Sequence, residues 1–473
     1  MTLRENQYDL VNQYDLVIIG SGSAAFSCAI ESRSKGASVA MIEHGTLGGT
    51  CVNVGCIPSK ALLAAADARH SALEKRFPGI TTTASPVDMG SLIMGKDSIV
   101  DALRQVKYED LVSTYGFDVL RGHARFISGP MLEVDGECIR ASNYVIATGS
   151  SPQIPAIPGL EETGYLTSKT AMELDHVPSS IVVIGGGFVG LEQGQLFSRL
   201  GSAVTLVARR RIAPLEEPEI SEALREILSE EGINVLSNTT VDRVRRNGSE
   251  VVVSLNSASG DFEMRAEALL VATGRRANTD DLGLEAVGVN IGTRGEVTVN
   301  DELRSSISNI FAAGDVTGHP QFVYVAGKHG VIVADNAIDG AHRRVDYRTL
   351  PRVTFTSPAI ASVGMTDEEA NKQGIVCECR VLPLTQVPRA IVNRDTRGVA
   401  KIVAERNSGR VLGVHLLAEG GADAILSAVY ALEAGFNVDQ LANIWTPYLT
   451  MAEAIKLTAQ SFTRDVSSLS CCA

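Results

Sequence analysis

The chain has 473 residues, of which 45% are hydrophobic and 21% charged, so it is long enough for about three domains and too apolar to be mainly disordered. Its 42 basic and 55 acidic residues give a formal net charge of −13, which argues against a nucleic-acid-binding protein. The sequence contains no run of about 18 apolar residues, the length needed to cross a membrane. Met1–Asn12 is too polar for a secretory signal. We therefore expect a cytoplasmic protein with reduced cysteines that binds neither nucleic acid nor membrane.

The first predicted unit is a strand, a glycine turn and a helix. The apolar run Asp15–Ile19 leads into Gly20-Ser21-Gly22-Ser23-Ala24-Ala25 and a helical segment, and a second apolar run, Ala37–Ile42, ends at Glu43. This is the dinucleotide-binding fingerprint: Gly20 allows the turn, Gly22 lets the backbone approach a pyrophosphate, and Ala25 lets the helix pack on the strand. Glu43 can accept both ribose hydroxyls of an adenosine, so the site suits FAD or NAD.

A glycine-rich box with two cysteines follows: Gly48-Gly49-Thr50-Cys51-Val52-Asn53-Val54-Gly55-Cys56-Ile57-Pro58-Ser59-Lys60. In a regular helix, residues five apart are too distant for a disulfide, whose Cα atoms lie within about 7 Å, but the glycines permit an irregular turn. Pro58 is suited to the first turn of a helix, so Cys56 would lie at a helix N-terminus, where thiolate is favoured over thiol. The pair is interpreted as a redox dithiol; two buried structural cysteines are the alternative.

Helical spacing continues from Lys60 to Gly116, interrupted by the polar stretch Thr81–Asp88. A strand at Tyr144–Ala147 then ends in Ala147-Thr148-Gly149. Small residues at such a strand end let the chain leave the sheet close to a bound ligand.

A second fingerprint repeats the first. Ser180–Ile184 leads into Gly185-Gly186-Gly187-Phe188-Val189-Gly190, a helical segment and the apolar run Ala203–Val207. Two copies in matching context make chance glycine turns an unlikely explanation. Ala208 stands as far from Gly185 as Glu43 does from Gly20, and Arg209-Arg210-Arg211 follows it. Guanidinium groups there can pair with a ribose 2′-phosphate, so this site favours NADPH over NADH; a solvated basic turn is the alternative.

Further elements follow the second fingerprint. The strand Leu269–Ala272 ends in Ala272-Thr273-Gly274, and Asn309–Phe311 precedes Ala312-Ala313-Gly314-Asp315. After about residue 350 the pattern predicts a separate α+β domain, with apolar runs Arg352–Val363, Val399–Val403 and Val411–Leu417 and helices Ala422–Ala434 and Met451–Gln460. Cys377 and Cys379 would share one face of a strand there; a soft-metal site is one interpretation and a structural role the other.

These motifs, in this order, resemble the flavoprotein disulfide reductase family over nearly the whole chain. The resemblance implies an α/β fold: two Rossmann-like dinucleotide-binding domains, for FAD and NADPH, plus a C-terminal α+β dimerisation domain. The implied domains are 1–165 (FAD, with a helical insertion), 166–290 (NADPH), 291–348 (FAD continuation) and 349–473 (dimerisation, with a cysteine tail). It also implies a homodimer whose active site is shared between subunits.

By the same resemblance, Cys51 and Cys56 form a redox-active disulfide in which Cys56 contacts the flavin and Cys51 exchanges with substrate. Lys60 and Glu192 match a pair beside the flavin, and Asp315 belongs to a segment contacting its ribityl chain. The remaining cofactor-binding residues expected are Gly49, Thr50, Thr148, Gly149, Gly187, Gly190, Arg209, Arg210 and Gly274.

The C-terminus separates members of the family. Disulfide-reducing members carry a histidine–proline motif that protonates the leaving thiol, and Tyr448 stands in that place here. A tyrosine pKa of about 10 suits this task poorly, whereas release of a thiolate-bound metal ion does not require it. Cys471 and Cys472 supply two adjacent soft sulfurs on a tail. Together with Gln321–Ala326, these features resemble the members that reduce mercuric ion.

The expected function is therefore NADPH-dependent reduction of Hg(II) for mercury detoxification. The ion would be held as a thiolate complex by Cys51, Cys56, Cys471 and Cys472. A separate N-terminal metal-binding domain is expected to be lacking, and Phe188 stands where some members have a tyrosine. Two alternatives remain open: an organic disulfide or dihydrolipoamide-type reductase, and a non-catalytic metal-sequestering flavoprotein.

Overall fold

The computed structural model describes residues 12–127, 129 and 131–468. They form two compact units. Unit 1 comprises residues up to 61, 93–153 and 274–345, and unit 2 comprises 62–92, 154–273 and 346 onward. Within these described ranges, no helix combines the length and apolarity needed to cross a membrane. The functional domain boundaries given above stay a prediction.

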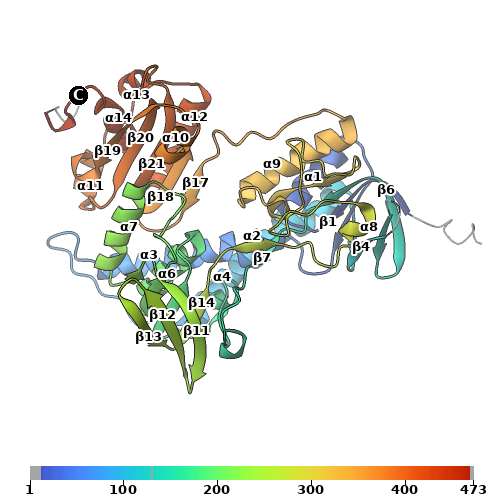
Figure 1. Cartoon of the computed structure of the whole chain (residues 1–473), viewed down its shortest axis with the longest axis horizontal. Coiled ribbons are helices and arrows are strands. Elements are labelled where there is room, and N and C mark those ends of the chain that lie inside the picture. Colours follow the sequence, from blue (N-terminus) through green and yellow to red (C-terminus); the bar gives the residue numbers. More distant parts are fainter. Residues whose placement is uncertain (1–11, 128, 130, 469–473) are drawn as a thin grey trace, which may run out of the picture. The chain divides into compact units, whose positions relative to one another are not determined.

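The core of unit 1 is one mixed sheet of seven strands (Figure 1). Its order is β3-β2-β1-β6-β5-β4, and β16 also pairs with β6. The strands are β1 (Asn12–Ile19), β2 (Val39–Glu43), β3 (Asp118–Arg121), β4 (Ala124–Ile127), β5 (Met131–Val134), β6 (Glu137–Ile146) and β16 (Ile310–Ala312). β1, β2, β3, β6 and β16 are parallel, as a Rossmann-like unit requires, while β4 and β5 form an antiparallel extension that the sequence analysis did not predict.

Two helices lie side by side against this sheet, α1 (Ser23–Ser34) and α9 (Val323–Ala334) (Figure 1). They approach closely because Gly330 lacks a side chain: a Cβ there would lie 2.3 Å from the carbonyl oxygen of Ala24. Cys28 is buried in α1 within the same cluster as Leu16.

The other elements of unit 1 are shorter or continue into unit 2. Helices α3 and α4 supply the predicted helical stretch before residue 116, and the polar break between them is confirmed. These elements are α2 (Gly49–Val54), α3 (Cys56–Leu73), α4 (Met89–Arg104), η1 (Gln105–Glu109), α5 (Asp110–Tyr115), β7 (Ser150–Pro152), β15 (Arg275–Ala277), α8 (Leu284–Val287), η4 (Gly314–Thr317) and η5 (Asp335–Asp339).

Unit 2 contains a second parallel sheet, of order β10-β9-β8-β14. The predicted strands Ser180–Ile184 and Ala203–Val207 are observed with those bounds as β8 and β9. A three-stranded antiparallel sheet, β11-β12-β13, was not predicted. The remaining elements here are η2 (Glu161–Thr163), η3 (Thr170–Glu173), α6 (Phe188–Leu200), α7 (Pro218–Glu230), β10 (Asn234–Leu236), β11 (Thr240–Asn247), β12 (Glu250–Ser257), β13 (Gly260–Ala266) and β14 (Ala268–Val271).

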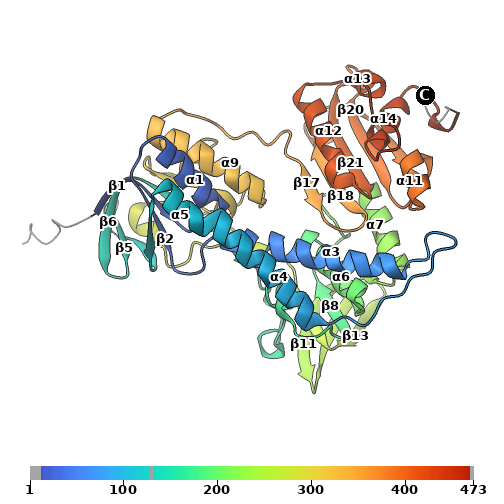
Figure 2. The same ribbon diagram turned by 180° about the vertical axis from the view of Figure 1, so that it is seen from behind.

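The rest of unit 2 is the predicted α+β domain, built on a five-stranded antiparallel sheet of order β17-β18-β21-β20-β19. Figure 2 shows α12 and α14 against this sheet. The predicted single run Arg352–Val363 is two strands, because the chain reverses at Ser357-Pro358. The elements are β17 (Arg352–Thr354), β18 (Ala359–Gly364), α10 (Asp367–Lys372), β19 (Cys377–Pro383), η6 (Leu384–Gln386), α11 (Pro388–Asn393), β20 (Val399–Glu405), β21 (Val411–Ala418), α12 (Gly421–Glu433), α13 (Val438–Asn443), α14 (Glu453–Gln460) and η7 (Val466–Ser468).

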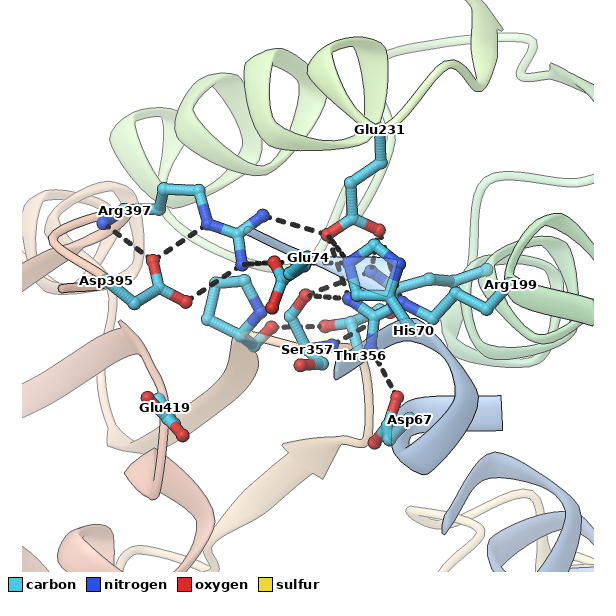
Figure 3. A network of polar contacts seen from close by, with 12 residues as sticks. Asp67, His70, Glu74, Arg199, Glu231, Thr356, Ser357, Asp395, Arg397 and Glu419 are labelled. Carbon is cyan, nitrogen blue, oxygen red and sulfur yellow. Dashed lines mark hydrogen bonds and ion pairs between the residues drawn. The ribbon is translucent and has the colours of Figure 1, made fainter. Parts of the chain in front are cut away.

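A charged network joins distant segments of unit 2 (Figure 3). At its centre the buried Glu231 carboxylate accepts from Arg199 at 2.8 Å and from Arg397 at 2.9 Å. Arg199 also pairs with Asp67 on α3 and donates to the carbonyl of Ser357 at 3.0 Å. Because each charge has an opposite partner, the network avoids the cost that an isolated buried charge would carry.

Candidate active site

The first glycine turn of unit 1 is built as the fingerprint predicts. Gly20 follows β1 with a φ of +107°, and a Cβ there would lie 2.4 Å from the carbonyl oxygen of Ala147, so any side chain would collide with the end of β6. Gly22 precedes the first turn of α1, and a Cβ there would meet nothing within 4 Å. The open space at Gly22, at the N-terminus of α1, fits a pyrophosphate.

Glu43 lies at the end of β2, beside this turn. Ser21 donates to one carboxylate oxygen at 2.6 Å, and the Gly45 backbone N–H donates to the other at 2.6 Å. These two donors fix the half-buried carboxylate as an acceptor, which fits the ribose hydroxyls of an adenosine. The residues present therefore fit the ADP part of FAD.

The second glycine turn, in unit 2, has the same construction. Gly185 has a φ of +127°, and a Cβ there would lie 2.2 Å from the carbonyl oxygen of Ala272. Gly187 precedes α6 with nothing within 4 Å of its Cβ position, while a Cβ on Gly190 would lie 2.0 Å from the Gly185 carbonyl oxygen. Gly20 thus packs against the segment Ala147-Thr148-Gly149 as Gly185 packs against Ala272-Thr273-Gly274. The second turn therefore fits a second dinucleotide.

The arginine triplet after β9 divides into two roles. Arg211 is half-buried and donates to the carbonyls of Pro214 at 3.3 Å and Glu216 at 2.6 Å, so it holds its own loop. Arg209 and Arg210 are exposed. They are free to turn toward a 2′-phosphate, and their assignment to NADPH stays a prediction.

We expect replacement of Arg209 and Arg210 by alanine to raise the KM for NADPH about 10- to 100-fold and to leave the KM for NADH nearly unchanged, because charge-assisted hydrogen bonds to a phosphate are lost. Steady-state kinetics with both nucleotides measure this difference. Arg245→Ala is the matched control, since Arg245 is an exposed arginine of the same unit that pairs with Glu263. An equal change for both nucleotides would refute the assignment.

The two cysteines of unit 1 meet at a break between two helices. α2 ends at Val54 and α3 begins at Cys56, with Gly55 between them at φ −126° and ψ −109°. A Cβ on Gly55 would lie 2.9 Å from the Thr50 carbonyl oxygen, so glycine permits this tight passage. The irregular turn lets the thiols of Cys51 and Cys56 hydrogen-bond to each other.

The two thiols differ in their electrostatics. The hydrogen bond to Cys56, burial and the negative charge of Cys56 raise the pKa of Cys51, and the charge of Lys60 opposes this only in part. Cys56 is the better placed of the two thiols to hold an anion. As the first residue of α3, it lies where the helix dipole and free N–H groups favour an anion.

Arg275 is a residue that the sequence analysis missed. Its guanidinium donates to the hydroxyl of Ser150 at 2.7 Å and lies 3.8 Å from the carboxylate of Asp315. Burial lowers the pKa of Arg275 below its ordinary value, and the negative charges of Asp315 and Cys56 oppose this only in part. The sequence could have indicated Arg275, because it directly follows Gly274, the last residue of an Ala-Thr-Gly segment that was predicted to lie close to a bound ligand. Thr148 lies at the same end, donating to the carbonyl of Asn278 at 2.6 Å.

Several predicted site residues lie outside this group. Glu192, in unit 2, is buried in α6 and accepts from the Phe355 backbone N–H at 2.9 Å, whereas Lys60 belongs to unit 1. Their role as a pair stays a prediction. Phe188 is exposed at the start of α6. Cys471 and Cys472 lie outside the described residues.

Tyr448 is one of several exposed apolar side chains of unit 2. Its side chain is 47% exposed, and Trp445 in the same segment is 100% exposed. Leu426 and Tyr430 on α12 are also exposed. Several exposed aromatic side chains are typical of a surface that another protein chain covers.

The chain belongs to the pyridine nucleotide-disulphide oxidoreductase family. The model of that family matches residues 14–330, and the model of its dimerisation domain matches residues 350–459. The match to the dimerisation-domain model falls on the α+β domain of unit 2.

Among relatives, a mercuric reductase of Streptomyces lividans is 57% identical over 97% of this chain and 98% of its own. A mercuric reductase of Lysinibacillus sphaericus is 48% identical over 98% of this chain and 86% of its own. Among solved structures, the Cu(II) complex of the HOCl-induced flavoprotein disulfide reductase RclA from Escherichia coli matches with a TM-score of 0.85 and 31% identity, over 96% of this chain and 100% of that one.

Proposed function

We propose that this protein is an NADPH-dependent mercury(II) reductase. The observation that carries the proposal is the pair of thiols, Cys51 and Cys56, that meet at the N-terminus of α3, where the neighbouring Cys56 thiol raises the pKa of Cys51. Two soft sulfur ligands side by side suit a thiophilic ion. The mercuric reductases that match this chain over nearly its full length support the same substrate.

The residues of the chain divide the work of the reaction. The turn at Gly20 and Glu43 would hold FAD, the turn at Gly185 with Arg209 and Arg210 would hold NADPH, and when bound these groups supply two electrons. Cys51 and Cys56 hold Hg(II) as a bis-thiolate complex. Overall, NADPH and Hg(II) give NADP⁺, a proton and neutral mercury, and both sulfurs remain as thiolates.

Tyr448 is consistent with this chemistry. Neutral mercury is a poor partner for thiolate and leaves without protonation of a leaving thiol. A group with an ordinary pKa of about 10 is therefore acceptable where a disulfide reductase needs an acid near neutral pH.

We further propose that the working form is a homodimer, in which Tyr448, Cys471 and Cys472 of one subunit serve the dithiol of the other. The matched dimerisation domain and the exposed aromatic side chains of unit 2 support a subunit interface. The cytoplasm supplies both NADPH and reduced thiols, so we expect the enzyme to work there.

The test is NADPH oxidation by the purified, FAD-loaded protein with Hg(II) and excess monothiol, run beside glutathione disulfide and lipoamide. We expect turnover with Hg(II) to exceed that with either disulfide. Faster turnover with a disulfide would identify an organic disulfide reductase, and metal binding without NADPH consumption would identify a sequestering protein.

A further inference from the structure

A second group of soft ligands lies in unit 2, on the edge strand of its five-stranded sheet. Cys377 and Cys379 are two residues apart on β19, so their side chains share one face, and Asp367 opens the helix packed beside them. Both sulfurs and a carboxylate oxygen of Asp367 lie within 4.8 Å of one another. The thiol of Cys377 already donates to Asp367 at 2.9 Å. Three ligand atoms therefore converge without any rearrangement of the backbone.

The carboxylate is held in place by a second layer of contacts. Asn371 donates to its Oδ1 at 2.7 Å, and the Asp367 backbone N–H donates to the buried Glu217 at 2.7 Å. Thr366 and Glu369 form a capping box around the same turn. Such outer contacts orient a metal ligand before the ion arrives.

We propose that Asp367, Cys377 and Cys379 form a second soft-metal site, which takes a thiophilic divalent ion such as Hg(II). Two thiolates select soft ions over magnesium or calcium, and one carboxylate completes a three-ligand set. Binding displaces the thiol protons to solvent. No electron transfer is involved, and the site does not depend on the reductase activity proposed above.

The surroundings of the two cysteines combine access for an ion with apolar packing. All three ligands are half-buried rather than enclosed, so an ion can reach them. Cys377 and Cys379 pack against a small apolar cluster of Ala370, Val403 and Leu412. Burial and the charge of Asp367 raise the pKa of Cys379 to about 12, and the positive charge of Lys401, which donates to Glu217 at 3.0 Å and to Glu219 at 2.9 Å, opposes this only in part.

The experiment uses the full-length, FAD-loaded protein in which Cys51, Cys56, Cys471 and Cys472 are serine. It is equilibrated with Hg(II) in excess glutathione, desalted, and its mercury measured by atomic absorption. We expect about one equivalent per chain to be retained, because two converging thiolates outcompete separate monothiols. Adding Cys377→Ser and Cys379→Ser should abolish retention, whereas adding Cys138→Ser should not.

Asp367→Asn provides a milder variant, expected to weaken Hg(II) binding about 10-fold while the thermal unfolding midpoint stays that of the parent. No retention by the parent, or equal retention after loss of Cys377 and Cys379, would overturn the proposal. In the otherwise native chain, Cys377→Ser with Cys379→Ser should leave mercury-dependent NADPH oxidation within about twofold of its original rate. This measurement separates failure of the second site from failure of the reductase activity.

Discussion

Replacement of Cys56 by serine is expected to lower mercury-dependent NADPH oxidation by about three orders of magnitude or more. A hydroxyl at this position neither ionises near neutral pH nor binds Hg(II), so the helix N-terminus that favours a thiolate has no anion to stabilise. Turnover with Hg(II) and excess monothiol measures the loss. Cys51→Ser should also lose turnover, because a single thiolate cannot hold the ion in a bis-thiolate complex.

Cys138→Ser is the matched control for these variants, since Cys138 is a half-buried thiol on β6 outside the dithiol pair. Flavin absorbance of each purified variant establishes that the fold still binds FAD. If Cys56→Ser retains turnover while Cys138→Ser loses it, the assignment of the dithiol is wrong.

Glu231→Gln is expected to lower the free energy of unfolding by about 3 kcal/mol at neutral pH. The Glu231 side chain is 6% exposed, and its neighbour Arg199 is 3% exposed, so the substitution leaves a buried guanidinium short of one negative partner. In the variant, Arg199 still pairs with Asp67 and Arg397 still pairs with Asp395. The expected loss of stability is therefore at the low end of the range observed when one partner of a buried ion pair is removed. Urea denaturation followed by circular dichroism measures it.

The effect should depend on pH in a defined direction. Burial alone would raise the pKa of Glu231, but the hydrogen bonds and charge of Arg199 lower it below its ordinary value. A lowered native pKa stabilises the fold above the ordinary carboxyl pKa of about 4.3, and this contribution is lost as the pH falls. The difference between the protein and Glu231→Gln should therefore stay constant from pH 7 to about pH 5 and shrink as the pH falls below about 4.3 toward the lowered native pKa.

Glu222→Gln is the control, because Glu222 forms an exposed pair with Arg225 one turn away on α7 and should contribute less than about 0.5 kcal/mol. Equal losses for Glu222 and Glu231 would show that burial of the network does not matter.

Much of the parallel-sheet architecture could be predicted from the sequence, because its signals are local. β8 and β9 are continuous apolar runs bounded by glycine or polar residues, and both were predicted with their observed bounds. β11 was missed because most of its side chains are exposed and it is ordered by pairing with β12 rather than by its own apolar pattern. The reversal at Ser357 was missed because an apolar run continues on both sides of it.

In the candidate site, too, contacts between residues close in the sequence could be predicted, and contacts between distant residues could not. The box from Gly48 to Lys60 is contiguous, so the meeting of Cys51 and Cys56 could be anticipated from its glycines. Glu231 and Arg397 are 166 residues apart in the chain, and no spacing rule relates them. Arg275 joins Asp315 only because β15 and the turn after β16 come together in the folded unit.

The exposed side chain of Trp445 has a spectroscopic consequence. It is the single tryptophan of the sequence, and it lies in the apolar segment that carries Tyr448. Indole emission shifts to shorter wavelength when water is removed from around the ring. The native emission spectrum of this protein therefore describes the solvation of one position, and it monitors without any label whatever comes to cover that face.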